Sequence, residues 1–227
     1  MRMLILGIFN SLSNKSVVGF ILYGSLPGNP ASAFVCAQLF LRTLMVKTAG
    51  PANVFEAELG PVDLALLGAG MYVPFDIRNI DAEGFRQTMA LNVDGVLNGV
   101  ASVMPTFTEQ KSGYVLAVSS VAGLKNYPGA SVYGGTKWFV RNFMEVLRME
   151  AAMEGSNIRT STLYPAAIST ELLDTITDQQ TATGMQGLYD AMAITPDRIA
   201  DVVAFALDLP EDTTVSEFTV GPARQPW

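Results

Sequence analysis

The sequence predicts a three-layer α/β fold of the doubly wound type, built on a single, mostly parallel sheet. Short apolar runs that end in glycine, serine or other small residues recur along the chain, and such runs are typical of buried strands. Longer stretches with apolar residues at helical spacing separate them, as the crossovers between parallel strands require. With 227 residues, 49% of them apolar and 15% charged, the chain can bury one sizeable core.

The composition excludes several classes of function. The net charge of −7 argues against nucleic acid as a general partner, because phosphate binding needs a basic face. The chain has no histidine, which excludes Ser-His-Asp catalysis and histidine-based metal sites, and we expect no bound metal. The single cysteine, Cys36, excludes an internal disulfide and favours a cytoplasmic location. We interpret Cys36 as a small core residue rather than a nucleophile.

The N-terminal part differs from the rest in charge, since residues 1–55 contain no aspartate or glutamate. Such asymmetry often marks a distinct segment. We expect strands at 3–6 and 17–23 and a helix at 31–46. Residues 16–41 carry no charge, but prolines and glycines interrupt them, so a buried strand and a core helix are favoured over a membrane span.

A glycine turn follows the second of these strands, with Gly24 and Gly28 in the segment YGSLPGNPA. A strand, a glycine turn and a helix can bind a pyrophosphate at the helix N-terminus. Pro30 has no N–H to offer a phosphate, however, and an ordinary turn is the alternative. If the first strand is used instead, the turn NSLSN that follows it contains no glycine.

The next elements are clearer. Residues 62–67 form a buried strand with a glycine-rich exit, and Asp81 can cap a long helix that follows it. Apolar residues line one face of that helix: Phe85, Met89, Val93, Val96, Val100 and Met104. Asn92 interrupts this face, so its buried amide must find hydrogen-bond partners.

The stretch 114–137 carries the candidate chemistry. A buried strand at 114–118 ends at Ser119 and Ser120, and a helix predicted from Ser131 to about Met153 places Tyr133 and Lys137 on one face. An ammonium beside a phenol favours the phenolate and lowers its pKa, which suits proton transfer. Ser120 can donate a hydrogen bond to the same oxygen, at the sheet edge where ligands bind. A Tyr-x-x-x-Lys pair alone is weak evidence, and an exposed pair is the alternative.

The remaining chain predicts a strand at 157–163, a polar segment at 171–194, a helix at 199–207 and a last strand at 217–220. We find no linker and expect one domain over residues 1–227, with an atypical part at 1–52. A sheet that is incomplete at the N-terminal side remains an open alternative.

The spacing of Ser120, Tyr133 and Lys137 closely resembles the signature of the short-chain dehydrogenase/reductase family, and the resemblance extends from about Asn53 to the C-terminus. It implies a Rossmann-like fold and hydride transfer between a nicotinamide cofactor and a small alcohol or ketone. It also implies a role for each residue. Tyr133 would exchange the hydroxyl proton, Lys137 would hold the nicotinamide ribose, Ser120 would bind the substrate oxygen and Asn92 would support a proton relay.

The resemblance also implies where the cofactor binds. The bend Gly68, Ala69, Gly70 matches the family's Asn-Asn-Ala-Gly segment without its asparagines, and Pro165 with Thr170 matches Pro-Gly-x-x-x-Thr. The family's Thr-Gly-x-x-x-Gly-x-Gly motif keeps Gly24 and Gly28 here, but Tyr23 replaces its threonine and Pro30 its last glycine. The residues expected to bind the cofactor are Gly24, Gly28, Gly68, Ala69, Gly70, Asn92, Tyr133, Lys137, Pro165, Ala166, Ile168 and Thr170.

The choice of cofactor is predicted from the lack of an acidic side chain in the N-terminal part. NAD is usually selected by an acidic side chain on the adenosine ribose, and none precedes Glu56. Arg42 and Lys47 could meet a 2′-phosphate, so we favour NADP(H) over NAD(H).

The resemblance further implies a homodimer or homotetramer and a segment over the substrate at 171–194. The alternative function is a catalytically impaired protein of the same fold that acts as a binding or scaffold subunit. This alternative is suggested by the departures from the family's glycine motif.

Overall fold

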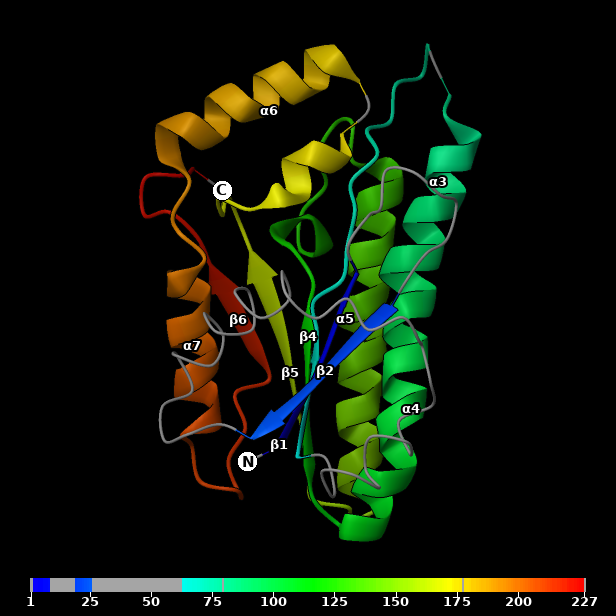
Figure 1. The fold of residues 1–227 in the computed structure, drawn as a ribbon, viewed down its shortest axis with the longest axis vertical. Coiled ribbons are helices and arrows are strands. Elements are labelled where there is room, and N and C mark those ends of the chain that lie inside the picture. Colours follow the sequence, from blue (N-terminus) through cyan, green and yellow to red (C-terminus); the bar gives the residue numbers. More distant parts are fainter. Residues whose placement is uncertain (1, 9–18, 26–62, 79, 177, 227) are drawn as a thin grey trace.

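The computed structural model describes residues 2–8, 19–25, 63–78, 80–176 and 178–226. Six strands form one sheet in this part of the chain, in the order β2-β1-β3-β4-β5-β6. Their bounds are Arg2–Ile8 (β1), Gly19–Ser25 (β2), Leu64–Leu67 (β3), Gly113–Val118 (β4), Ile158–Pro165 (β5) and Glu217–Val220 (β6). From β1 to β6 all neighbours are parallel, and β2 alone is antiparallel at one edge (Figure 1). The predicted, mostly parallel α/β fold is confirmed.

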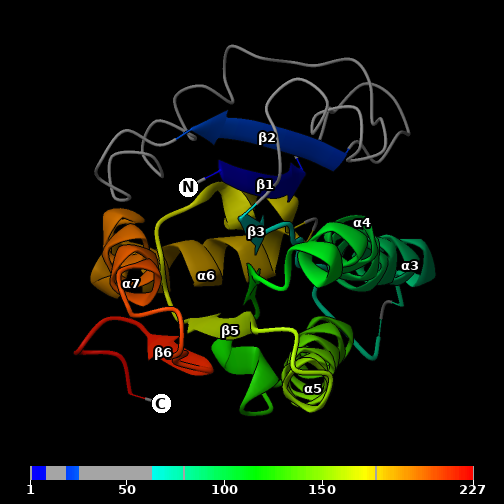
Figure 2. The ribbon, with the colours of Figure 1, turned by 90° about the horizontal axis from the view of Figure 1, so that it is seen from below.

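Helices cover both faces of this sheet and give three layers (Figure 2). The helices are α3 (Ala82–Met89), α4 (Gly95–Gln110), α5 (Ser131–Met153), α6 (Gln179–Met192) and α7 (Asp197–Leu207). Three short helical turns precede α4, α5 and α6, respectively: η1 (Ala90–Asp94), η2 (Val121–Gly123) and η3 (Glu171–Thr175). Helices α4 and α5 lie on one face and α7 on the other. No helix in these ranges combines the length and the apolarity that crossing a membrane needs.

The core follows from the two-residue period of the strands. In β3, Ala65 and Leu67 pack with α4 and α5, whereas Leu64 and Leu66 pack against α7. Strand β4 repeats the pattern with Val115 and Ala117 on the first face. Because both faces of the central strands are buried, these strands need apolar residues throughout, which explains their unbroken apolar runs.

The long helix expected after Asp81 is divided into α3 and α4. Asp81 caps α3 as predicted, since its carboxylate accepts a hydrogen bond of 2.8 Å from the N–H of Gly84. A π-helical turn, η1, then separates α3 from α4. Such a turn inserts a residue into the helix and often marks a functional site.

The N-terminal strands are found near their expected positions but with a different topology. The prediction that β2 ends at Tyr23 in a glycine turn is wrong, because β2 continues through Gly24 to Ser25 and pairs antiparallel with β1. A hairpin partner of this kind cannot be told from a parallel strand by its own sequence, because both are apolar and extended. The helix expected at 31–46 and Gly28 lie outside the described residues.

Candidate active site

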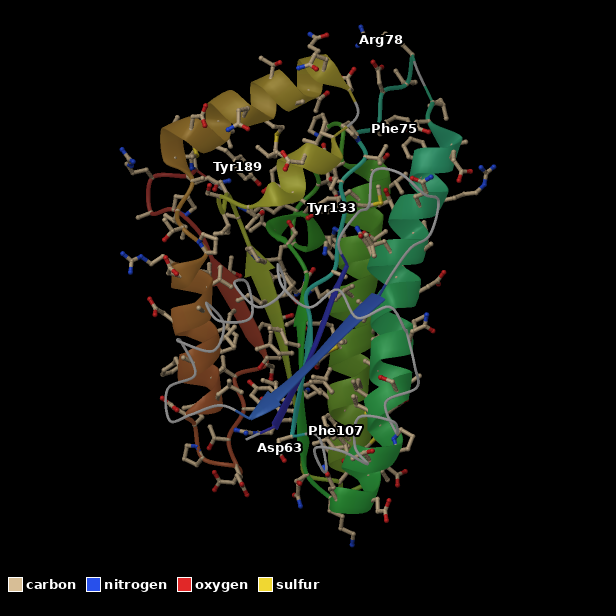
Figure 3. All side chains as sticks on the ribbon, in the orientation of Figure 1. Asp63, Phe75, Arg78, Phe107, Tyr133 and Tyr189 are labelled. Carbon is tan, nitrogen blue, oxygen red and sulfur yellow. The ribbon has the colours of Figure 1, made fainter. Side chains whose placement is uncertain are left out.

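The candidate catalytic residues meet at the carboxyl ends of the parallel strands. Ser120, Tyr133, Lys137 and Asn92 are all buried, although they come from a strand exit, a helix start and the π-helical turn. Figure 3 shows Tyr133, from α5, beneath α6, the helix that carries Tyr189. The sequence prediction that these elements converge at this edge agrees with the structure.

Asn92 is fully buried, and its side chain fixes the chain that leaves β3. Its Oδ1 accepts a hydrogen bond of 2.9 Å from the N–H of Met71, and its Nδ2 donates to the carbonyl of Met71 at 3.0 Å. The second hydrogen of Nδ2 goes to Oγ1 of Thr136, also at 3.0 Å. Thr136 in turn donates to the carbonyl of Tyr133 at 2.7 Å. Asn92 therefore ties the exit of β3 to the first turns of α5.

Lys137 places a buried cation at the same edge. Its side chain is only 4% exposed, and Nζ donates to the carbonyl of Val118, at the end of β4, at 3.0 Å. Burial lowers the pKa of Lys137 to about 8. A Cβ atom on Gly70 would lie 3.3 Å from Nζ and 3.6 Å from Oδ1 of Asn92. The glycine thus keeps space open beside the ammonium.

Tyr133 is also buried, and its electrostatics differ from the prediction. Burial raises the pKa of Tyr133 to about 12, while the hydrogen bond from Ser120 acts in the opposite direction. The expected lowering by Lys137 is not found. Nζ of Lys137 lies 5.6 Å from the centre of the Tyr133 ring and is directed to the carbonyl of Val118. Loss of water around the phenol therefore dominates.

Two adjacent serines have different tasks. Ser120 caps η2, and its Oγ accepts a hydrogen bond of 3.1 Å from the N–H of Ala122, so its own hydrogen can be donated toward Tyr133. Ser119, which sequence reasoning did not single out, donates to the carbonyl of Lys137 at 2.9 Å. Ser119 thereby anchors α5 to the end of β4.

Besides Asn92, Tyr133 and Lys137, two further groups of residues expected to bind the cofactor lie near the site. Gly68, Ala69 and Gly70 follow β3, at the same edge as the residues above. Pro165 is the last residue of β5, and the loop that follows it contains Ala166, Ile168 and Thr170. In that loop the N–H of Ala166 donates to the carbonyl of Val220 at 2.8 Å, Ile168 is buried, and Thr170 caps η3. Both loops therefore leave the sheet at the candidate site.

Gly24 is not brought to this site. It pairs with Met3, which pairs with Leu64 at the start of β3, so Gly24 lies at the opposite edge of the sheet. Gly24 therefore does not lie in the expected glycine turn, because β2 continues through it and runs antiparallel to β1. Gly28 lies outside the described residues.

Several residues that sequence reasoning missed cover Tyr133. Tyr72 packs on Tyr133 with its ring edge-on, with 4.9 Å between ring centroids. These two tyrosines, Ala122, Ala130 and Ile176 form an apolar cluster, against which Leu172, Leu173, Ala182 and Met185 pack. The phenols of Tyr72 and Tyr189 also contribute to the raised pKa of Tyr133. An aromatic residue shortly after Gly70 was visible in the sequence, but nothing local linked it to the 171–194 segment.

Comparisons with known proteins identify relatives of this chain. The family model described as short chain dehydrogenase matches residues 47–181. An uncharacterized oxidoreductase of Listeria monocytogenes is 53% identical over 192 residues, which is 83% of this chain and 77% of the relative.

Two solved structures share the fold. An alcohol dehydrogenase from the archaeon Thermococcus sibiricus, complexed with 5-hydroxy-NADP, gives a TM-score of 0.65 at 21% identity, over 77% of this chain and 69% of that one. The closed form of a serine dehydrogenase complexed with NADP+ gives a TM-score of 0.68 at 22% identity, over 85% of this chain and 73% of that one.

Proposed function

Since the chain belongs to the short-chain dehydrogenase family of NAD(P)-dependent oxidoreductases, we propose that it transfers a hydride between NADP(H) and a small alcohol or carbonyl compound. The observation that carries this proposal is the convergence of Ser120, Tyr133, Lys137 and Asn92, all buried, at one edge of the sheet. An exposed Tyr-x-x-x-Lys pair, the alternative interpretation of the motif, does not fit that burial.

The nicotinamide end of the cofactor suits the residues at this edge. Among the described residues the ammonium of Lys137 has one hydrogen-bond acceptor, the carbonyl of Val118, so two of its three hydrogens remain for a ligand. Gly70 keeps space open beside them. Lys137 would therefore hold the nicotinamide ribose, with Gly68, Ala69 and the loop 165–170 as the walls. When bound, the nicotinamide ring supplies or accepts the hydride.

Tyr133 would exchange the proton with the substrate oxygen. Its raised pKa keeps the phenol protonated near neutral pH, so Tyr133 is ready to donate a proton to the oxygen of a carbonyl that is being reduced. Ser120 would donate a hydrogen bond to the same substrate oxygen.

Asn92 would support the return of the proton. Its amide is held by Met71 and Thr136, and one lone pair of Oδ1 remains for a water molecule. Because the cation of Lys137 lies across the space beside Gly70, a water held there could pass a proton toward Lys137.

The preference for NADP(H) rests on the lack of an acidic residue before Glu56 and on Arg42 and Lys47. The alcohol dehydrogenase and the serine dehydrogenase named above were both solved with NADP or a derivative, which supports the same choice. Fluorescence titration of the purified chain with NADPH and with NADH tests it. Tighter binding of NADH would contradict the preference.

The proposed chemistry is tested with Tyr133→Phe. The substitution removes only the phenolic hydroxyl, so kcat for reduction of cyclohexanone, benzaldehyde or diacetyl should fall about a hundredfold or more, the usual contribution of a positioned acid. Affinity for NADPH should change little. Tyr127→Phe, at an exposed position, is the matched control. A Tyr133→Phe variant that keeps most of its kcat would show that another group transfers the proton.

The second candidate function is a catalytically impaired protein that acts as a binding or scaffold subunit. The observation in its favour is the position of Gly24 at the opposite edge of the sheet. There Gly24 cannot contact the phosphates of a cofactor that binds at the candidate site. Absence of binding by both NADPH and NADH in the same titration would favour this candidate over the enzyme.

A further inference from the structure

Tyr72 makes contacts in three directions at the candidate site. Its N–H donates to Oγ1 of Thr175 at 3.0 Å, and its hydroxyl donates to the carbonyl of Gly129 at 3.3 Å. Its ring lies edge-on to the ring of Tyr133, at 4.9 Å and 66°. Tyr72 therefore lies between the residue proposed to transfer the proton and the elements η3 and α6, together called the cover below.

We propose that Tyr72 is a positioning residue for Tyr133, and that Thr175 is the latch through which the closed cover sets the position of Tyr72. This inference rests on the proposed function, because it takes Tyr133 as the group that exchanges the proton. It adds two residues, 103 positions apart in the sequence, that the family motif does not contain.

The backbone carries the first half of the link. Asn92 holds both the N–H and the carbonyl of Met71, and the very next N–H, that of Tyr72, is held by Thr175. The hydroxyl of Thr175 donates to the carbonyl of Leu172 at 2.7 Å, which leaves its oxygen oriented as an acceptor for Tyr72. Two neighbouring peptide groups are thus bonded to Asn92 and to the cover, so displacement of the cover removes one of the two restraints.

The ring carries the second half. Edge-on aromatic contacts are attractive and directional, so the ring of Tyr72 restricts where the ring of Tyr133 can lie. The hydroxyl of Tyr72 holds the ring near Gly129, because it donates to the carbonyl of Gly129. The same carbonyl also accepts a hydrogen bond of 2.7 Å from the N–H of Phe75. Gly129 lies just before Ser131, where α5 begins. The same helix carries Tyr133 in its first turn.

The cover closes over both rings. Leu172 and Leu173 from η3, and Ala182 and Met185 from α6, pack on the cluster that contains Tyr72 and Tyr133. In this arrangement the cover excludes water from the phenol of Tyr133, and Thr175 of the same cover holds the N–H of Tyr72. Burial is also the main cause of the raised pKa of Tyr133.

The latch is tested without any substrate by hydrogen exchange on the full chain. Thr175→Val removes the hydroxyl at nearly constant volume, so amide exchange should become roughly 2- to 10-fold faster in the peptide containing Tyr72 as well as in the peptide 172–176. Thr175→Ser, which keeps the hydroxyl, should restore most of the protection. Thr183→Val is the matched control, because Thr183 is exposed and donates only within α6, to the carbonyl of Gln179. Unchanged exchange at Tyr72 in Thr175→Val would overturn the latch.

Positioning is tested by kinetics with NADPH and the most active of cyclohexanone, benzaldehyde and diacetyl. Tyr72→Leu keeps an apolar side chain but removes the ring, so kcat should fall about fivefold or more and KM for NADPH should stay constant. The limb of the pH profile that reports Tyr133 should also move to lower pH, because water then reaches the phenol. Tyr72→Phe should restore most of the lost kcat. A role in packing alone would lower the melting temperature and leave the pH profile in place.

The outcomes separate this inference from the proposed function. A Tyr72→Leu variant with wild-type kcat and pH profile, beside an inactive Tyr133→Phe, would overturn the positioning role and leave the proposed function standing. An active Tyr133→Phe would remove the proposed function itself. If Tyr72→Leu does not fold, the exchange result for Thr175→Val decides whether the link exists.

Discussion

Lys137 carries a positive charge into the interior of the protein, with the carbonyl of Val118 as its hydrogen-bond partner. Burying a charge without an opposite charge is unfavourable, and that cost explains the lowered pKa of Lys137, about 8 against a usual 10.5. A site that binds a ligand through this ammonium therefore carries a cost in folding free energy when no ligand is present.

The first prediction concerns pH and stability. Because the pKa of Lys137 is lower in the folded than in the unfolded protein, the unfolded chain binds more protons between pH 8 and 10.5, and the free energy of unfolding rises with pH. The full effect is on the order of 3 kcal/mol. The raised pKa of Tyr133 acts in the opposite direction, but only above its usual value of 10, so the window from pH 8 to 10 isolates Lys137.

Urea unfolding at pH 8, 9 and 10 measures this dependence. The free energy of unfolding should rise with pH more steeply in the wild type than in Lys137→Met. Lys125→Met, at an exposed lysine, controls for the loss of one positive charge. Equal slopes for the wild type and Lys137→Met would contradict the prediction.

Local spacing was enough to group Ser120, Tyr133 and Lys137 as catalytic candidates, whereas the role of Asn92 came from the resemblance to the family. Tyr133 and Lys137 are one helical turn apart, and Ser120 follows directly from the end of a strand, so short-range geometry determines their positions. The pKa of Tyr133 could not be predicted in the same way, because it depends on how much water Tyr72 and the cover exclude. Tyr72 and Thr175 were missed because their hydrogen bond joins positions 103 residues apart.

At the scale of elements, β1 and β2 matter most for the cofactor. A helix N-terminus can bind a phosphate only if it lies at the edge of the sheet where the ligand lies. The carboxyl end of β1 lies at the edge of the candidate site, because Leu6 pairs with Leu67. The carboxyl end of β2 lies at the other edge, because Ser25 pairs with Arg2. The sequence suggested the glycine turn after the second strand, and strand direction, which depends on the whole sheet, decides against it.

The second prediction is weak dinucleotide binding that one graft improves and another does not. Pro27 and Pro30 have no N–H to donate, and two missing hydrogen bonds to phosphate would weaken NADPH binding about a hundredfold or more, since each is worth roughly 1.5–3 kcal/mol. The family segment Thr-Gly-x-x-x-Gly-x-Gly grafted directly after Ile8 should recover much of this affinity. The same segment grafted at residues 23–30 should not.

Titration calorimetry with NADPH and NADH on the unaltered chain and both grafts checks this prediction. Recovery by the graft at 23–30 alone would show that β2, and not β1, leads to the phosphate. Micromolar binding by the unaltered chain, improved by neither graft, would show that other residues bind the pyrophosphate.

At the scale of the whole molecule, α5 presents apolar side chains that stay exposed in the described part of the chain. They are Trp138, Val146, Met149 and Met153, with exposed fractions between 40% and 84%. Exposed apolar surface on one helix often marks a contact with another protein chain. Its position on an outer helix allows two copies to meet through the same face, as a two-fold axis requires.

The third prediction is therefore a homodimer, or a tetramer built from such dimers, in which α5 contributes to the interface. Light scattering at micromolar concentration should give at least twice the mass of the chain, 24.3 kDa. The double substitution Val146→Glu and Met149→Lys should shift the protein to a smaller species, whereas Phe205→Ser on α7 should leave the α5 contact intact. A monomeric wild type would contradict the prediction.

The hydrogen bond between Tyr72 and Thr175 also affects how the chain is made. Ribosomes add about 5–20 residues per second, so the 103 positions between the two residues correspond to roughly 5–20 s of synthesis. During that time the N–H of Tyr72 has no threonine acceptor. The side-chain amide of Asn92 likewise lacks its acceptor, the hydroxyl of Thr136, until Thr136 is synthesised. Until η3 emerges, water rather than Thr175 is the hydrogen-bond partner of the Tyr72 N–H in the nascent chain. Molecular chaperones that bind unfinished chains would meet this protein in that interval.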